Sequence, residues 1–261
     1  MSKYFLILRL FWASAVAAEL EYRLNFVVAA ITAVGNFAGS LFALSLFYQR
    51  SNSLGDWSWQ EALLVMGLFT ILEGLSSTML APNLNKIVQH VQKGTLDFIL
   101  LKPVDSQMWL SLRNISLWGL PNVFLGVVLV IYAGAAEHIP LGYCILGLAP
   151  FFLSMVILYS LWFFLASLTI WFTKIYNLTE VLHGVMEAGR YPMAAYPAVW
   201  RFFFTFVIPV AFLTTVPAET ALRRSGAAQW VAAEAVLALG LFLFARYFWR
   251  FALRFYTSAS S

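Results

Sequence analysis

Charged side chains are scarce in this sequence. They make up 11% of the 261 residues, whereas hydrophobic residues make up 62%. Soluble domains carry about 25% charged residues, so a chain of this composition could not cover a folded surface with polar groups. Three stretches, residues 24–49, 114–136 and 139–173, hold no charged residue at all. The composition therefore excludes a soluble domain and predicts an integral membrane protein.

The sequence also lacks groups that bind metals and nucleotides. Cys144 is the only cysteine, so no disulfide can form within the chain. No cluster of histidine, cysteine or carboxylate residues has the spacing of metal ligands, and no G-x-x-x-x-G-K-[ST] phosphate-binding segment is present. We therefore expect no metal site and no cofactor in this chain. Another polypeptide or an ion gradient would have to supply energy for any transport.

The apolar segments predict an all-α, polytopic membrane protein that forms a single domain over residues 1–261. A transmembrane helix needs about 20 consecutive apolar residues. By this measure the sequence predicts six transmembrane helices, over residues 24–48, 62–81, 114–135, 142–172, 200–216 and 227–248.

Residues 4–22 predict a helix of another kind. Lys3 and Arg9 flank short apolar stretches there, and Trp12 suits the membrane interface. We therefore predict an N-terminal interfacial helix. The alternative is a cleaved secretory signal, because the small residues at 13–17 imitate a cleavage site. Arg9, however, interrupts the apolar stretch that such a signal requires.

The basic residues set the predicted orientation. With both termini in the cytoplasm, only Arg50, Arg223 and Arg224 of the 16 Lys and Arg residues fall outside. Cytoplasmic loops of membrane proteins carry such an excess of basic residues. The net charge of +4 therefore reflects topology. The expected partner is the lipid bilayer, and no nucleic acid is needed to explain the charge.

A short amphipathic helix follows the second predicted span. We expect Pro82 to end that span and Asn83 to cap the next helix. Beyond Asn83, apolar residues recur at the spacing of one helix face: Leu84, Ile87, Val88 and Val91. Gly94 then ends the helix. A helix that lies on the bilayer surface would show the same pattern.

The segment after Gly94 favours a docking element instead. Residues 95–103 predict a compact apolar turn, and Pro103 stiffens it because a proline pushes the preceding residue, Lys102, into an extended conformation. A helix that only lies on the bilayer needs no such rigid continuation.

Two stretches of this sequence resemble a known family. Residues 94–107, GTLDFILLKPVDSQ, are similar to the Gly-x-hydrophobic-Asp-x-Leu-Leu-Lys/Arg-Pro segment of membrane subunits of ABC exporters of the second type, in the group that lacks a fused ATPase. Residues 190–192, with FVIPVA at 206–211 and VPA at 216–218, resemble the second half of that group. The resemblance covers nearly the whole chain.

This resemblance implies a multi-pass permease subunit in the bacterial cytoplasmic (inner) membrane. Its partners would be an ABC ATPase subunit in two copies, which binds ATP and Mg²⁺, and a second permease subunit, identical or related. The segment after the second span would be the coupling helix, which seats in a groove of the ATPase. Residues 214–229 would belong to a pair of re-entrant helices at the outer mouth. The family also implies export, of a hydrophobic or amphipathic substrate.

The residues of the coupling segment suit such docking. The apolar stripe would supply a desolvated contact, charged residues at its rim would fix the orientation, and glycine and proline would stiffen the linkage. The residues predicted to dock the ATPase are Leu84, Ile87, Val88, Val91, Lys93, Gly94, Asp97, Lys102 and Pro103.

Glu73 is the most conspicuous polar residue within a predicted span. A charged residue at the bilayer centre costs about 2.5–3.5 kcal/mol on insertion scales, so we expect it to face other helices, a cavity or a partner. Two interpretations stay open. Glu73 lines the transport path, or it braces two helices through a hydrogen bond.

The predicted loop over residues 176–196 carries four polar residues along one helix face: Glu180, His183, Glu187 and Arg190. One interpretation is a cytoplasmic gate, or a second contact with the ATPase. The other is a solvated helix face with weak internal ion pairs.

Small residues in the first predicted span leave a further choice open. Gly35 and Gly39 form a small-x-x-x-small pair, which permits close helix approach. Packing within the chain and contact between two permease subunits would both use it.

Two other functions compete with the exporter. An ion-gradient-driven secondary carrier would need buried charges near the membrane midplane, where Glu73 stands almost alone. An intramembrane serine protease could use Ser76 with His183 as its base. That pair must approach within about 2.6–3.2 Å, and the predicted topology keeps the two residues apart.

Overall fold

The structure is a computed structural model that describes residues 3–20, 23–50, 53–172 and 176–257. No strand occurs within these residues, which confirms the predicted all-α class. The elements are α1 (Lys3–Leu20), α2 (Arg23–Arg50), α3 (Trp59–Leu75), η1 (Ser76–Leu80), α4 (Ala81–Gln92), α5 (Asp97–Leu100), α6 (Ser106–Leu112), α7 (Leu120–Ala136), α8 (Leu141–Ser167), η2 (Leu168–Ile170), α9 (Tyr176–Met186), η3 (Glu187–Arg190), η4 (Met193–Ala195), α10 (Ala198–Phe202), η5 (Phe203–Val207), α11 (Ala211–Ala221), α12 (Ala227–Ala252) and η6 (Leu253–Phe255).

Several helices are long enough to cross a membrane. The four that pass on length and composition are Leu24–Gln49, Trp59–Gln92, Leu141–Ile170 and Ala227–Phe255. A pair bent by 99°, Ala198–Val207 and Ala211–Ala221, makes a fifth if it is one span. α7 is apolar but has only 17 residues. The described residues thus give four to five candidate spans, and the count of six stays a prediction.

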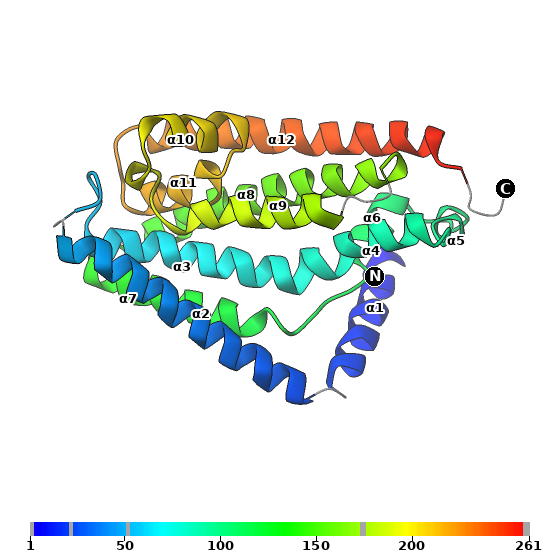
Figure 1. Ribbon diagram of the computed structural model, residues 1–261, viewed down its shortest axis with the longest axis horizontal. Helices are drawn as coiled ribbons and strands as arrows, with labels where there is room; N and C mark the ends of the chain where they lie inside the picture. The colour runs from blue at the N-terminus through cyan, green and yellow to red at the C-terminus, as the bar shows by residue number, and fades with distance from the viewer. Residues whose placement is uncertain (1–2, 21–22, 51–52, 173–175, 258–261) are drawn as a thin grey trace.

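Most of the helices follow one common axis (Figure 1). α3 packs along α7, α8 packs against α11 and α12, and α2 reaches α7 obliquely from outside. α1 lies across one end of the bundle, the end that also holds α4, α5, α6 and both chain termini. We call this end the α5 end and the opposite one the α10 end.

The α3–α7 contact is unusually close. A Cβ atom added to Gly74 would lie 2.6 Å from the backbone nitrogen of Val123, and one added to Gly126 would lie 2.7 Å from that of Ile71. Any larger residue at these positions would push the helices apart, because glycine alone lets the two backbones meet. The closely packed helices α3 and α7 therefore form one side of the bundle, and Glu73 belongs to α3.

The core is aromatic, and much of the outer surface is apolar. Trp162, Phe163 and Trp249 are fully buried where α8 meets α12. By contrast, Leu24 of α2 is 80% exposed and Val236 of α12 is 73% exposed. Apolar surface of this extent needs lipid or another membrane protein to cover it, as expected for a multi-pass membrane protein.

The helix does not end at Pro82, so that prediction is wrong. α3, η1 and α4 form one continuous helix, Trp59–Gln92. Proline lacks the N–H that would bond the carbonyl four residues earlier, which is that of Thr78. That carbonyl instead accepts a hydrogen bond from Ser116 N–H at 2.9 Å. The π-helical turn η1 lies just ahead of the proline ring, and such turns absorb local irregularity in a helix.

Asn83 also has a different role from the predicted one. Its side chain is buried within the continuous helix and caps nothing. The amide nitrogen Nδ2 donates to the carbonyl oxygens of Met79 and Asn114, both at 2.7 Å, and Oδ1 accepts from Asn114 N–H at 2.8 Å. Asn83 therefore links α4 to the segment that follows α6.

The predicted span 200–216 is not a single helix. It breaks at Ile208, whose backbone is extended (φ −121°, ψ 104°), because the residue before a proline, here Pro209, is pushed out of the helical region. The two pieces meet at 99°. This bent pair, Ala198–Val207 and Ala211–Ala221, overlaps only the first part of residues 214–229, where the resemblance implied re-entrant helices.

The segment predicted as a cytoplasmic loop runs back through the bundle. α9 lies along α8, and η3 contacts α3 and α11 (Figure 1). Leu182 and Met186 of α9 are buried in the main core. Because this segment returns to the α10 end, Arg201 lies at that end and not beside the α5 end as predicted.

Candidate functional site

The stripe predicted to dock the ATPase faces the interior of the protein. Leu84 and Ile87 are 0% exposed and Val88 is 2% exposed, while Val91 is partly buried. α4 packs this face against α6 and α8, because apolar side chains bury against the nearest apolar surface and the end of α8 provides one. The stripe therefore offers no surface to a partner, which corrects the role assigned to these residues.

An apolar ledge lies beside the buried stripe. We use this name for Phe98, Leu100 and Leu101, whose exposed fractions are 68%, 39% and 82%. Leu96 and Ile99 are buried and anchor the ledge to the core. The sequence shows a run of apolar residues here, but it does not reveal which of them a four-residue helix turns outward.

The remaining predicted docking residues surround the ledge. Gly94 has φ of +68°, a conformation that favours glycine, and it turns the chain from α4 towards α5. Lys93, Lys102 and Pro103 are exposed, and Asp97 is partly buried at the start of α5. The structure thus brings these five residues together around an apolar centre.

An ion pair ties the α5 end to α12. Asp105 Oδ1 accepts from Arg246 Nη1 at 2.7 Å, and Asp105 Oδ2 accepts from Arg246 Nη2 at 2.5 Å. These bonds hold the pKa of Asp105 below its usual value, because they stabilise the carboxylate. Nearby, Trp249 Nε1 donates to Ser106 Oγ at 3.1 Å. These contacts tie the segment that follows the ledge to α12.

Two predicted sites meet inside the bundle. Arg190 Nη2 lies 3.6 Å from Glu73 Oε2 and 2.6 Å from Glu187 Oε2. Arg190 Nη1 donates to Ser40 Oγ at 2.7 Å, and the guanidinium lies 4.6 Å from the centre of the Phe69 ring. We call these five residues the Arg190 cluster. It joins α2, α3 and η3.

His183 lies next to this cluster. It lines a cavity of about 40 Å³ together with both glutamates of the cluster, and its ring packs edge-on against Trp162 with centroids 4.5 Å apart. The side chain of Glu180 lies outside the described residues. His183 and Arg190 are therefore partly buried against the bundle, whereas 52% of the Glu187 side chain is exposed. The segment that carries them packs on α3, α8 and α11 and is not a separate loop.

Ser76 lines the same small cavity as His183. The Oγ atom of Ser76 is buried, yet it has no hydrogen-bond partner among the described residues. A nucleophilic serine is hydrogen-bonded to its base, so the two residues do not form a protease pair in this structure.

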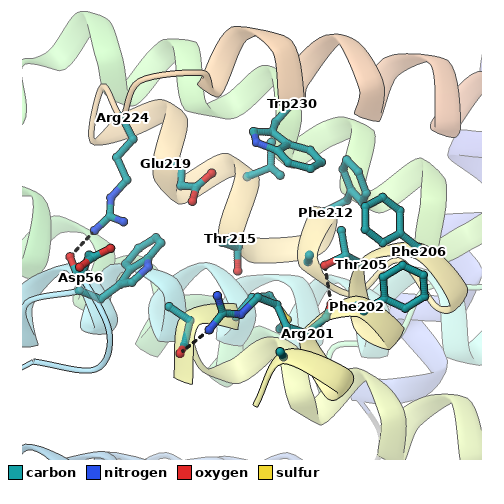
Figure 2. Close-up of a pocket in the computed structure, with 16 residues that line it drawn as sticks. Asp56, Arg201, Phe202, Thr205, Phe206, Phe212, Thr215, Glu219, Arg224 and Trp230 are labelled. Carbon is teal, nitrogen blue, oxygen red and sulfur yellow. Dashed lines mark hydrogen bonds between the residues drawn. The ribbon is translucent and has the colours of Figure 1, made fainter. Parts of the chain in front are cut away.

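A larger cavity, of about 550 Å³, opens at the α10 end. Figure 2 shows aromatic side chains on one side and charged side chains on the other: Phe202, Phe206, Phe212 and Trp230, facing Asp56, Arg201, Glu219 and Arg224. Arg224 Nη2 donates to Glu61 Oε2 at 2.9 Å, whereas Arg201 Nη2 donates to the carbonyl oxygens of Ala194 and Tyr196 at 3.2 and 3.3 Å.

The sequence did not point to this cavity. Its lining comes from the turn before α3, the bent pair and the first turns of α12, which lie far apart in sequence. Residues 200–216 were predicted to form one span, and a single helix would not fold back to enclose such a cavity. The proline at 209, which follows the break, was the one available signal.

The fold and these sites define a polytopic helical membrane protein with a polar cluster inside its bundle and an apolar ledge at one end. The chain belongs to the ABC-2 family of transporter proteins, because the family model described as ABC-2 family transporter protein matches residues 34–260. This match confirms the resemblance seen in the sequence. Neither the search of curated proteins nor the search of solved structures gave a match.

Proposed function

We propose that this chain is the membrane-spanning permease subunit of an ABC exporter in a bacterial cytoplasmic membrane. It moves a hydrophobic or amphipathic substrate out of the cytoplasm. The observation that carries this proposal is the family match over residues 34–260. A separate ATPase subunit, present in two copies, binds ATP and Mg²⁺ and performs the hydrolysis, so the chain itself needs no catalytic residue.

The proposed topology has six crossings. These are α2, the continuous helix from α3 to α4, α7, α8, the segment over residues 176–195, and α12. The bent pair is then a re-entrant pair at the outer surface, and α1 lies at the inner interface. Two observations support this arrangement. Both termini lie towards the α5 end (Figure 1), and exposed basic residues such as Lys93, Lys102 and Arg250 gather there, as the positive-inside rule requires of a cytoplasmic side.

The ledge is the proposed contact for the ATPase. Exposed apolar residues rimmed by charged ones are typical of protein interfaces, and at the cytoplasmic end they lie where a soluble partner can reach them. Gly94 and Pro103 flank the ledge, and the Asp105–Arg246 pair connects it to α12. Movement of the ATPase would therefore reach α4 and α12 together.

Glu73 keeps both of its proposed roles. Its ion pair with Arg190 at 3.6 Å supports a brace between α3 and η3. However, 35% of its side chain remains exposed, which leaves part of the carboxylate free to contact a substrate. The cavity at the α10 end, with its aromatic and charged sides, suits an amphipathic molecule on the outer part of the same path.

The second permease subunit is proposed to cover α2. Only 11% of the most apolar part of this helix is buried, and a Cβ added to Gly35 or Gly39 would meet no atom of another segment within 4 Å. Beside it lies a groove of about 390 Å³ whose lining includes Asn25, Asn36 and Asn122. Amide side chains are costly against lipid, so a protein partner, identical or related, explains this face better.

A gradient-driven secondary carrier is the alternative function. The observation that favours it is the Arg190 cluster, because charged pairs inside a membrane bundle often mark ion pathways. The two functions separate cleanly in vesicles. An ATP-powered permease stops when ATP is removed and continues when the ion gradient is collapsed, whereas a carrier does the reverse.

The ATPase contact can be tested with one exposed residue at each end. We expect Leu101→Glu to lower co-purification with the ATPase subunit, and the ATPase activity that depends on it, about tenfold or more, because central apolar contacts dominate interfaces. Val199→Glu is the matched control, since Val199 is 78% exposed at the α10 end. Equal ATPase binding by both variants and the unmodified chain would remove the ledge from the interface.

A further inference from the structure

A second cavity at the α5 end has an unusual charge. It encloses about 290 Å³ between α4 and the segment after α6, and its lining is Lys86, Gln89, His90, Lys93, Thr95, Arg113 and Asn114. We call it the basic pocket. Lys86, Lys93 and Arg113 carry positive charge, and no carboxylate lines the pocket. Within the described residues, none of the three cations forms an ion pair.

Hydrogen bonds fix the walls of this pocket. Lys86 Nζ donates to Asn114 Oδ1 at 2.9 Å, and Asn114 is in turn held by the buried Asn83 at 2.8 and 3.1 Å. On the other side, His90 Nδ1 lies 2.7 Å from Thr95 Oγ1. These bonds hold Lys86 and His90 in place, and the side chains of Lys93 and Arg113 line the same pocket. Like charges repel at such a distance. An anion in the pocket would remove this repulsion.

Contacts with α1 place the basic pocket beside the N-terminal helix. Trp12 Nε1 donates to the Leu112 carbonyl at 3.0 Å, and Glu19 accepts from Leu117 N–H. These two contacts lie on either side of Arg113 and Asn114 in the chain. α1 lies across this end of the bundle (Figure 1). The interfacial role proposed above for α1 therefore puts the pocket at the level of the lipid headgroups.

We propose that the basic pocket binds the phosphate headgroup of an anionic phospholipid from the cytoplasmic leaflet. Basic pockets between helices at this side of a membrane suit such headgroups, and ammonium, guanidinium and amide groups together satisfy phosphate oxygens. The inference rests on the proposed orientation but not on transport or on the ATPase. Its test therefore has a separate outcome from those of the proposed function.

The test measures lipid retention by native mass spectrometry on the purified full-length chain in detergent. The probes are phosphatidylglycerol, phosphatidylcholine and inorganic phosphate. We expect phosphatidylglycerol to bind more tightly than phosphatidylcholine. The double variant Lys86→Gln/Arg113→Gln should bind phosphatidylglycerol about 30-fold more weakly, at about fivefold for each charge removed. Arg254→Gln removes a charge from the same end but outside the pocket, and it should bind normally.

Further variants keep the result interpretable. Arg113→Lys retains the charge and should retain binding, while Lys93→Gln changes an exposed side chain and should weaken binding about fivefold even if the double variant misfolds. Equal binding of the two lipids, or an equal loss in Arg254→Gln, would overturn the proposal. If inorganic phosphate displaces the lipid at equal concentration, the lipid source is wrong. If the double variant Lys86→Gln/Arg113→Gln binds the lipid normally but no longer associates with the ATPase subunit, the pocket is a contact for that subunit and the lipid proposal is wrong.

Discussion

Arg190 illustrates how one residue can organise a membrane bundle. Its guanidinium contacts Glu73 of α3, Glu187 of η3 and Ser40 of α2, three segments that are distant in sequence. Two carboxylates share one cation, so the removal of that cation leaves like charges close together in a partly buried place, where 35% of the Glu73 side chain and 52% of the Glu187 side chain are exposed. The cost of an unpaired charge in such a place exceeds the gain that its pairing provided.

At this scale we predict that Arg190→Met destabilises the protein. Removal of one partner of a buried ion pair lowers the free energy of unfolding by about 3–5 kcal/mol. We expect a loss of about 2 kcal/mol here, because Glu73 is only partly buried. The measurement is thermal unfolding of the purified chain in detergent. Arg201→Met is the matched control, because Arg201 bonds only backbone carbonyls among the described residues, and it should lower the midpoint less.

Glu73→Gln in the same assay decides between the two roles of Glu73. If Glu73 only braces the helices, Arg190→Met and the double variant Arg190→Met/Glu73→Gln should differ, with the second more stable, since the unpaired carboxylate is gone. A Glu73→Gln variant that unfolds normally but loses transport would instead assign the carboxylate to the substrate path.

At the scale of elements, the helix from α3 to α4 shows what one chain's sequence conveys. The glycine at 94 predicted the end of the helix, and the structure ends α4 at Gln92 with Gly94 in the turn that follows. Its passage through Pro82 was not predictable, because it depends on Ser116 from another segment. The prediction that the apolar stripe from Leu84 to Val91 faces a partner was wrong for a similar reason. An amphipathic pattern indicates that one face is buried, but it does not identify what buries it.

Asn83 provides the prediction at this scale. We expect Asn83→Ala to lower stability by about 2–4 kcal/mol, because it leaves the Asn114 backbone and the Met79 carbonyl without this partner, and each unsatisfied buried group costs about 1–3 kcal/mol. Asn85→Ala, two residues along the same helix and exposed, should change stability by less than about 0.5 kcal/mol. Equal midpoints of thermal unfolding for the two variants would mean that the Asn83–Asn114 link carries no stability.

At the scale of the whole molecule, composition alone predicted a multi-pass helical membrane protein, and the structure and family match bear this out. The path of residues 176–195 was missed. Glu180, Glu187 and Arg190 made the segment appear too polar for the bundle, and a hydropathy pattern cannot register that Arg190 pairs in space with Glu187 and Glu73. The cavity at the α10 end was missed as a consequence, since the same error moved Arg201 to the wrong end.

The route of this segment can be tested by cysteine labelling. In a Cys144→Ser background, single cysteines replace Val199, Leu101 and Ser225, and an impermeant maleimide is applied to intact spheroplasts and to permeabilised ones. A return of residues 176–195 through the bundle carries Val199, which is 78% exposed, to the α10 end together with Ser225. Both should then be labelled in intact spheroplasts, whereas Leu101→Cys should require permeabilisation. If residues 176–196 instead form a cytoplasmic loop, Val199→Cys must behave like Leu101→Cys, because the chain has not yet crossed the membrane.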